Sequence, residues 1–145
     1  MAECLNHHDA TNATLHHGTE PGAEIDAIAA SVLDCAFAVH RAFGPGLRES
    51  AYEQCLCLGL ADRRLRFERQ KALSITYLGQ SIPNALRPDL IVEGVLVVEV
   101  KAVESLLPVH QAQIRTYLRL ANLRLGLLIN FNVPLLKNGV RRVLL

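Results

Sequence analysis

Hydrophobic residues recur every three or four positions over residues 24–43 and again over residues 47–63, which is the spacing of an amphipathic helix. A Gly-Pro-Gly sequence at residues 44–46 separates the two segments, because glycine favours a helix end and proline does not continue a helix. A third helix is predicted over residues 108–120, and it can begin at Pro108 because proline is tolerated in the first turn of a helix.

The segments that follow the second and third helices are rich in β-branched and aliphatic residues, which favour strands. A strand is predicted within residues 67–77, before a turn at Gly79, and a hairpin is predicted over residues 86–101. Two more strands are predicted over residues 125–130 and 140–145. The order of elements is ααβββαββ, which is typical of an α/β fold whose central sheet is covered by helices.

The composition of the 145 residues indicates one domain with a mobile N-terminal tail. The first 23 residues are polar and lack periodicity, so the domain is expected to span residues 24–145. The formal net charge is only +1, which argues against strong non-specific affinity for nucleic acid through many exposed cations. Arginines and lysines still gather at residues 63–71 and 115–124. Each cluster forms either a local basic face or ordinary solvated surface.

No targeting or membrane signal is visible in the sequence. The N-terminus lacks the apolar segment of a signal peptide, and no stretch is long enough to cross a bilayer. The four cysteines form no CxxC pair, and free thiols in a reducing compartment are the simplest interpretation. The sequence therefore predicts a cytoplasmic protein without a zinc site and without a membrane partner.

Charged residues interrupt the most apolar part of the chain, the predicted hairpin. Asp89 lies in its first strand, and Glu99 and Lys101 end its second strand. A buried charge is costly unless it is paired, and residues two apart project from the same side of a strand. Two carboxylates and a lysine at the end of a buried hairpin suit a divalent-metal site that activates water.

The position of Asp89 relative to Glu99 depends on the turn of this hairpin. A two-residue turn at Glu93 and Gly94 would place Asp89 opposite Val98 and direct it away from Glu99, since directly opposite residues share a face. A three-residue loop with Gly94 in the left-handed conformation, or a bulge near Asp89, would bring both carboxylates to one face. We expect one of these two arrangements.

Four short motifs resemble those of the PD-(D/E)xK nuclease superfamily. Pro88-Asp89 followed by Glu99-Val100-Lys101 matches the motif that names the superfamily. Residues 113–117 (QIRTY) match the QxxxY element of the branch that resembles the RecB nuclease domain and lambda exonuclease. Residues 46–52 (GLRESAY) match the signature that names the GxxExxY protein family. The resemblance runs over about residues 25–145 and implies a restriction-endonuclease-like core with a central mixed sheet flanked by helices.

The resemblance implies a catalytic or metal-binding role for residues of the hairpin and the third helix. Asp89 and Glu99 would bind Mg²⁺ or Mn²⁺, with the backbone carbonyl of Val100 and waters completing the shell. Lys101 would orient or deprotonate the attacking water, or stabilise charge on the phosphate. Gln113 and Tyr117 are also implied site residues. They are four apart on a helix and face the same way, either to position the nucleic acid and the catalytic residues or merely to complete the core.

Glu49 has two interpretations. It lies in the first turn of the predicted second helix, where a carboxylate interacts favourably with the positive end of the helix. The resemblance suggests instead that Glu49 reaches the metal as a further ligand.

The leading hypothesis is a metal-dependent nuclease that hydrolyses phosphodiester bonds of nucleic acid, with DNA favoured over RNA. The complete set of Asp89, Glu99 and Lys101 favours catalysis, because a retired site has no physical reason to keep charges in an apolar strand. The near-neutral charge favours a non-catalytic nucleic-acid-binding or assembly module, or a nuclease that needs a homodimer or a protein partner to hold its substrate. A small-molecule phosphodiesterase with the same metal chemistry is a third hypothesis.

Overall fold

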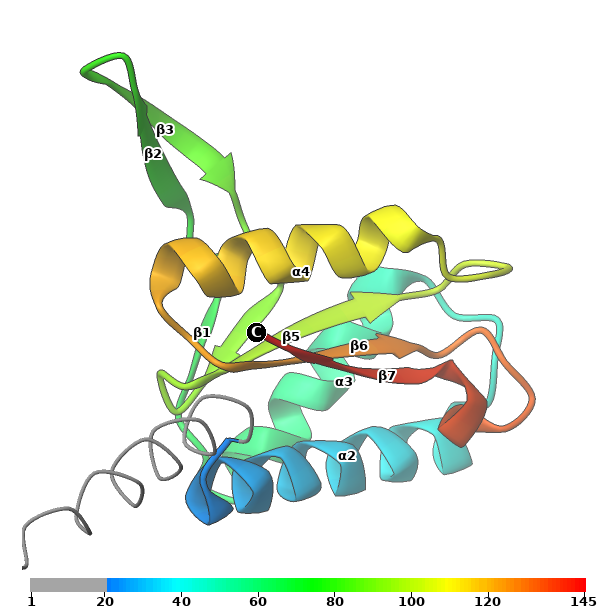
Figure 1. Cartoon of the computed structure of the whole chain (residues 1–145). Helices are drawn as coiled ribbons and strands as arrows, with labels where there is room; N and C mark the ends of the chain where they lie inside the picture. Colours follow the sequence, from blue (N-terminus) through cyan, green and yellow to red (C-terminus); the bar gives the residue numbers. More distant parts are fainter. Residues whose placement is uncertain (1–20) are drawn as a thin grey trace, which may run out of the picture.

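A five-stranded mixed sheet forms the centre of the chain, and helices cover both of its faces (Figure 1). The computed structural model describes residues 21–145. In it, α2 (Ala23–Phe43) and α3 (Glu49–Asp62) cover one face of the sheet, and α4 (Pro108–Ala121) covers the other. The predicted α/β class is therefore confirmed, while the predicted tail over residues 1–23 lies almost entirely outside the described residues. Within the described part of the chain, no helix has the length and apolar character needed to cross a membrane.

The strands of this sheet follow the order β1-β4-β5-β6-β7. Their bounds are Phe67–Arg69 for β1, Leu90–Val92 for β4, Leu96–Lys101 for β5, Leu125–Asn130 for β6 and Val140–Leu144 for β7, and the short 3-10 helix η1 (Leu136–Gly139) precedes β7. β5 and β6 are parallel and are joined through α4, whereas the other neighbouring strands are antiparallel. Because helices cover both faces, the side chains of these two central strands are almost all buried, as their aliphatic sequences predict.

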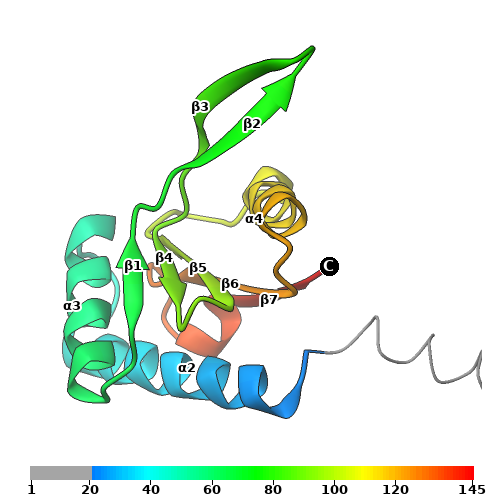
Figure 2. The ribbon, with the colours of Figure 1, turned by 90° about the vertical axis from the view of Figure 1, so that its left-hand side faces the viewer.

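A separate two-stranded hairpin projects from this core (Figures 1 and 2). It consists of β2 (Leu73–Tyr77) and β3 (Gln80–Leu86), so the observed order is ααβββββαββ, with two strands more than predicted. The predicted strand over residues 67–77 is divided between two sheets, because Gln70 adopts a positive φ of 54° that ends β1. The sequence pattern misses β3 because six of its seven side chains are exposed, which removes the hydrophobic alternation that identifies a strand.

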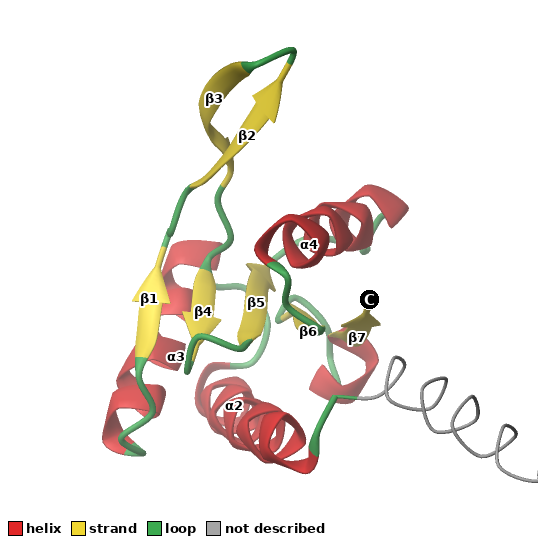
Figure 3. Cartoon of the chain, turned by 60° about the vertical axis from the view of Figure 1, so that its left-hand side comes forward, coloured by secondary structure: helices red, strands yellow, loops and turns green. Residues whose placement is uncertain are grey.

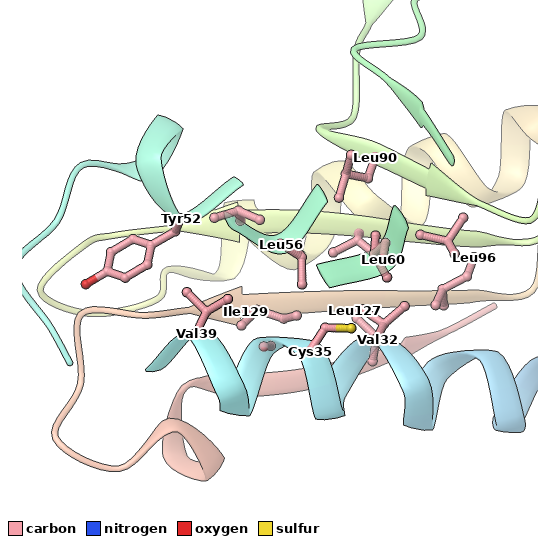
Figure 4. Close-up of a cluster of buried hydrophobic side chains, with 14 of the residues drawn as sticks. Val32, Cys35, Val39, Tyr52, Leu56, Leu60, Leu90, Leu96, Leu127 and Ile129 are labelled. Atoms are coloured by element: carbon pink, nitrogen blue, oxygen red, sulfur yellow. The ribbon is translucent and has the colours of Figure 1, made fainter. Parts of the chain in front are cut away.

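Two hydrophobic clusters lie on the two faces of the central sheet. The larger lies between the sheet and the helices α2 and α3, and Figure 4 shows these buried members of it: Val32, Cys35, Val39, Tyr52, Leu56, Leu60, Leu90, Leu96, Leu127 and Ile129. The smaller contains Val97 of β5 with Ile114, Tyr117 and Leu118 of α4. Since side chains alternate along a strand, Glu99 shares the face of Val97, and the end of β5 presents its charged residues towards α4.

Candidate active site

The turn of the β4–β5 hairpin places Asp89 opposite Glu99. Val92 pairs with Leu96, so the connection between the strands is a three-residue loop. Gly94, at the centre of this loop, has a φ of 68°, a conformation that glycine adopts without steric cost. Extending the same register by one residue beyond β4 brings Asp89 directly across from Glu99. The predicted three-residue loop with a left-handed Gly94 is confirmed.

Arg66 holds the first residue of this loop. Glu93 also has a positive φ, of 52°, and its carboxylate accepts hydrogen bonds from the backbone N–H of Arg66 at 2.7 Å and from the Arg66 guanidinium at 3.1 and 3.2 Å. The backbone hydrogen bond, followed by the side-chain contacts of Arg66, lowers the pKa of Glu93. These contacts tie the hairpin loop to the segment that precedes β1, and they favour the register that the carboxylates require.

Two hydrogen bonds from backbone N–H groups to carboxylates connect the segment of Asp89 with that of Glu99. The N–H of Asp89 donates to Oε1 of Glu99 at 3.0 Å, and the N–H of Val100 donates to Oδ2 of Asp89 at 2.8 Å. Burial, and next the negative charge of Asp89, raise the pKa of Glu99 to about 8, although Lys101 acts in the opposite direction. A divalent cation would relieve this repulsion, and carboxylate oxygens are the hard ligands that Mg²⁺ and Mn²⁺ prefer, so the residues fit such an ion.

Both carboxylates line a pocket of about 340 Å³ between the sheet and α4. Lys101 of β5 and Gln113 and Tyr117 of α4 line the same pocket. Further walls come from the end of β3 and the segment after it, at residues 85–88. The structure thus brings together five of the residues that the sequence analysis assigned to catalysis, and their catalytic roles stay predictions.

The close approach of α4 to the sheet depends on Gly126 in β6. A Cβ atom at this position would overlap with Cγ2 of Ile114, which is buried on α4. Because Gly126 has no side chain, α4 can pack closely against β6, and this packing places Gln113 and Tyr117 at the pocket. Burial raises the pKa of the Tyr117 phenol, so it stays a neutral hydrogen-bond donor at neutral pH.

A buried glutamate on α3 supports Asp89 through Gln70. The side-chain amide of Gln70 donates to Oε1 of Glu53 at 3.2 Å and to Oδ1 of Asp89 at 3.1 Å, and Arg69 lies 3.5 Å from Oε2 of Glu53. Glu53 is only 8% exposed, so these contacts satisfy a carboxylate that would otherwise be costly to bury. The sequence pattern singled out neither Glu53 nor Gln70. The one signal in the sequence that could have identified Glu53 is its position: four residues after Glu49, it places a charge on the apolar face of the predicted second helix.

Glu49 lies outside this pocket. It is in the first turn of α3, and its Oε2 accepts a hydrogen bond of 3.4 Å from the N–H of Ala102, just after β5. Within residues 21–145, no group of three or more His, Cys, Asp or Glu residues is arranged to hold a metal ion. The position of Glu49 agrees with the first-turn interpretation. Its role as a ligand, like that of the Val100 carbonyl, stays a prediction.

The GxxExxY segment connects the loop after α2 with the end of β5. The phenol of Tyr52 donates to the carbonyl of Gly44 and accepts a hydrogen bond of 3.1 Å from the N–H of Leu47. The Tyr52 ring stacks on Phe131 with a centroid distance of 4.5 Å, and the N–H of Phe131 donates to the carbonyl of Lys101 at 2.9 Å. This segment therefore stabilises the backbone that carries Lys101, at a position outside the pocket.

Charges are divided unevenly between the two sides of the sheet. Helices α2 and α3 contain six acidic residues and one arginine: Glu24, Asp26, Asp34, Glu49, Glu53, Asp62 and Arg41. Helix α4 and the segment 69–88 contain no Asp or Glu, and they carry Arg69, Lys71, Arg87, Arg115 and Arg119. These segments add no acidic side chain to the pocket, whose carboxylates come from the hairpin. Arg69 and Lys71 are paired with Glu53 and Glu68, so Arg87, Arg115 and Arg119 carry the positive charge that suits a polyanion.

Comparison with known proteins agrees with this arrangement. Neither the curated proteins nor the solved structures that were compared with the chain gave a match. A family model described as the PD-(D/E)XK nuclease superfamily matches residues 26–143, which includes all of the pocket residues. Nucleases of this superfamily generally use divalent metal ions. Since the match spans most of its length, the chain belongs to the PD-(D/E)XK nuclease superfamily.

Proposed function

We propose that the protein is a metal-dependent nuclease that hydrolyses phosphodiester bonds of nucleic acid, with DNA favoured over RNA. The observation that carries this proposal is the gathering of Asp89, Glu99 and Lys101 in one pocket, beside Gln113 and Tyr117. Burial, and next the charge of Asp89, raise the pKa of Glu99, so two partly buried carboxylates at this place cost stability that neutral residues would not. A bound cation gives these carboxylates a function that offsets the cost. The cationic and neutral chain segments around the pocket support a polyanionic substrate.

Asp89 and Glu99 would hold Mg²⁺ or Mn²⁺, with the backbone carbonyl of Val100 and with Glu49 as a further carboxylate. The bound ion would polarise the phosphate and lower the pKa of a coordinated water. Lys101 orients or deprotonates the attacking water, or stabilises the negative charge that develops on the phosphate. The hydrogen bonds from Val100 and Gln70 keep the carboxylate of Asp89 oriented while the reaction proceeds.

Gln113 and Tyr117 position the substrate. Both line the pocket from α4, and the neutral phenol of Tyr117 is suited to donate a hydrogen bond to a phosphate oxygen. A small displacement of the phosphate from the reacting groups can cost orders of magnitude in rate. These two side chains therefore affect the rate without acting as metal ligands.

Finer assignments follow from the same residues. The GxxExxY and QxxxY segments support membership of the GxxExxY family, within the branch that resembles the RecB nuclease domain and lambda exonuclease. The small net charge of +1 supports a homodimer or a protein partner that helps to hold the substrate. The free cysteines of the described residues, Cys35, Cys55 and Cys57, are consistent with a cytoplasmic location.

The test is cleavage of labelled single-stranded and double-stranded DNA and RNA by the full chain in Mg²⁺, Mn²⁺ or chelator. We expect cleavage only with metal, and a loss of at least about 100-fold in Glu99→Gln. Glu24→Gln is the matched control, because Glu24 is exposed on α2, on the opposite side of the sheet.

Binding of nucleic acid without cleavage in any metal would instead support the non-catalytic module. Cleavage of dinucleotides but not of polymers would support a small-molecule phosphodiesterase. Full activity of Glu99→Gln would exclude Glu99 as a metal ligand.

A further inference from the structure

The hairpin of β2 and β3, here called the arm (residues 73–86), extends away from the core (Figures 2 and 3). Its C-terminal end lies at the rim of the pocket, which Ala85 and Leu86 line. At its base, Leu73 pairs with Leu86, and both pack against the hydrophobic cluster under α4. A strand of substrate that leaves the pocket on this side would therefore meet the arm.

One face of the arm carries an apolar stripe beyond this base. Ile75 and Tyr77 lie at alternate positions of β2 and share a face, and Ile82 lies across from Ile75. The register of the two strands shifts between Leu73 and Ile75, so the regular part of the stripe begins at Ile75. Exposure increases outwards along the stripe, and Tyr77 is 66% exposed. An isolated two-stranded hairpin is only marginally stable in water, so an arm with uncovered apolar side chains is expected to have a binding role.

At the tip of the arm, Leu78 has a backbone conformation that is unfavourable for leucine. Tyr77 pairs with Gln80, which leaves a two-residue turn of Leu78 and Gly79 with φ values of 47° and 75°. Asparagine or aspartate is preferred before glycine in such a turn, because a bulky side chain is strained at positive φ. Leu78 is also 83% exposed, so burial does not compensate for the strain. A strained, exposed leucine suggests that the side chain is selected for a contact outside the chain.

The charges of the arm indicate the chemistry of that contact. The segment 69–88, which contains the arm, has no acidic residue, and Arg69, Lys71 and Arg87 lie near its base. Arg69 is paired with Glu53 and Lys71 with Glu68, whereas Arg87 bonds only to the neutral amide of Asn84 among the contacts of the described residues, so Arg87 is the cation best placed to meet a phosphate. Apolar and aromatic side chains that adjoin cations are typical of surfaces that bind single-stranded nucleic acid, where bases stack on aromatic rings. The faces of bases inside a duplex are already stacked and are not available to Tyr77.

We propose that the arm binds unpaired nucleobases of the substrate next to the pocket, with Tyr77 as a stacking surface and Leu78 as an apolar contact at the tip. This rests on the proposed function and assigns it a substrate class, nucleic acid with a single-stranded segment. Four residue steps separate Tyr77 from Leu73, or about 13 Å at the rise of a strand. This distance equals about four nucleotides at the rise of about 3.4 Å per nucleotide of a duplex strand, and fewer nucleotides of an extended strand, so Tyr77 contacts a base that is not at the rim of the pocket itself.

The test is the affinity of the full chain for fluorescently labelled single-stranded oligonucleotides in chelator, where no cleavage interferes. Tyr77→Ala should weaken binding about five- to a hundredfold, and Tyr77→Phe, which keeps the ring, should bind like the wild type. Leu78→Asn should also weaken binding, while its melting temperature stays equal or rises because the strain is removed. Leu58→Ala is the matched control, since Leu58 is 73% exposed on α3, and it should leave affinity unchanged.

Two further comparisons restrict the interpretation. A blunt duplex should bind the wild type more weakly than a single strand does, and Tyr77→Ala should not change its affinity. A dinucleotide is too short to reach Tyr77 from the pocket, so it should bind the wild type and Tyr77→Ala equally.

Equal single-strand affinity of wild type and Tyr77→Ala would overturn the proposal. A wild-type dimer that Tyr77→Ala dissociates, with unchanged affinity for single strands, would overturn it in favour of self-association through the arm. The failure of the nuclease proposal is distinguishable from both results. If no metal produces cleavage but Tyr77→Ala still loses single-strand affinity, the arm assignment stands and the catalytic proposal fails.

Discussion

The backbone N–H of Asp89 donates a hydrogen bond of 3.0 Å to the carboxylate of Glu99, so the two acidic residues are held across the hairpin from one another. This contact keeps the carboxylates close even though burial and repulsion raise the pKa of Glu99 to about 8. The site is therefore arranged for a cation before one binds. We expect this arrangement to lower the free energy of unfolding of the metal-free protein.

The metal-free protein should lose stability as the pH rises from about 5 to about 8. The pKa of Glu99 is about 8 in the folded protein against 4.5 for an unperturbed glutamate, so the folded state retains a proton that the unfolded chain has released in this interval. Stability is highest below the unfolded value and falls until the folded value is passed, by an amount on the order of a few kcal/mol. Urea unfolding in chelator at several pH values measures this slope.

Glu99→Gln should flatten the slope, because glutamine does not titrate, whereas Glu24→Gln should leave it unchanged. Added Mg²⁺ or Mn²⁺ should raise the stability of the wild type more at pH 8 than at pH 5, since the ion binds the deprotonated pair. A wild-type slope that Glu99→Gln does not alter would show that another group is responsible.

Gln70→Ala should lower both stability and activity. The Gln70 amide bridges Glu53 and Asp89, and its removal leaves a buried carboxylate with fewer donors, at an expected cost of about 1–3 kcal/mol. Gln54→Ala is the matched control, because Gln54 is exposed on α3. Thermal melting and the cleavage rate of both variants make the comparison, and a Gln70→Ala protein indistinguishable from Gln54→Ala would refute the support that Gln70 gives to Asp89.

Gln113→Ala and Tyr117→Phe should each reduce the cleavage rate by about tenfold or more while metal affinity stays nearly unchanged, because positioning dominates their contribution. Metal titration and single-turnover rates separate the two effects. Gln111→Ala provides the control, since this glutamine lies on α4 but does not line the pocket of the two carboxylates. If the residues merely complete the core, Tyr117→Phe will keep full activity, and Gln113→Ala will lose stability and activity together.

Tyr52→Phe should destabilise the protein by about 1–3 kcal/mol, since the phenol bridges the carbonyl of Gly44 and the N–H of Leu47. Ring stacking on Phe131 is retained in this variant, so the effect isolates the hydroxyl group. The melting temperature of Tyr77→Phe, which alters an exposed phenol, should stay at the wild-type value. An unchanged melting temperature in Tyr52→Phe would show that the two hydrogen bonds contribute little to stability.

Elements whose residues carry a local signal could be predicted from the amino-acid sequence alone. The helical spacing of apolar residues identified α2, α3 and α4 to within about two residues of their observed ends, because amphipathic periodicity and Gly or Pro at a helix boundary act over a few residues. The aliphatic run of residues 125–130 identified β6, and the charges in an apolar hairpin identified Asp89, Glu99 and Lys101 as candidates for one site.

The way in which these residues meet depends on contacts that form only in the folded chain. The sequence left open a three-residue loop or a bulge, and the pairing of Val92 with Leu96 selected the loop. The bridge from Glu53 through Gln70 to Asp89 joins residues that are far apart in the chain, so no local periodicity indicates it. The projecting arm also escaped prediction, because its exposed side chains lack the alternation that burial imposes on a strand. Register, packing distance and exposure arise from contacts between distant segments, and local residue patterns constrain such contacts only weakly.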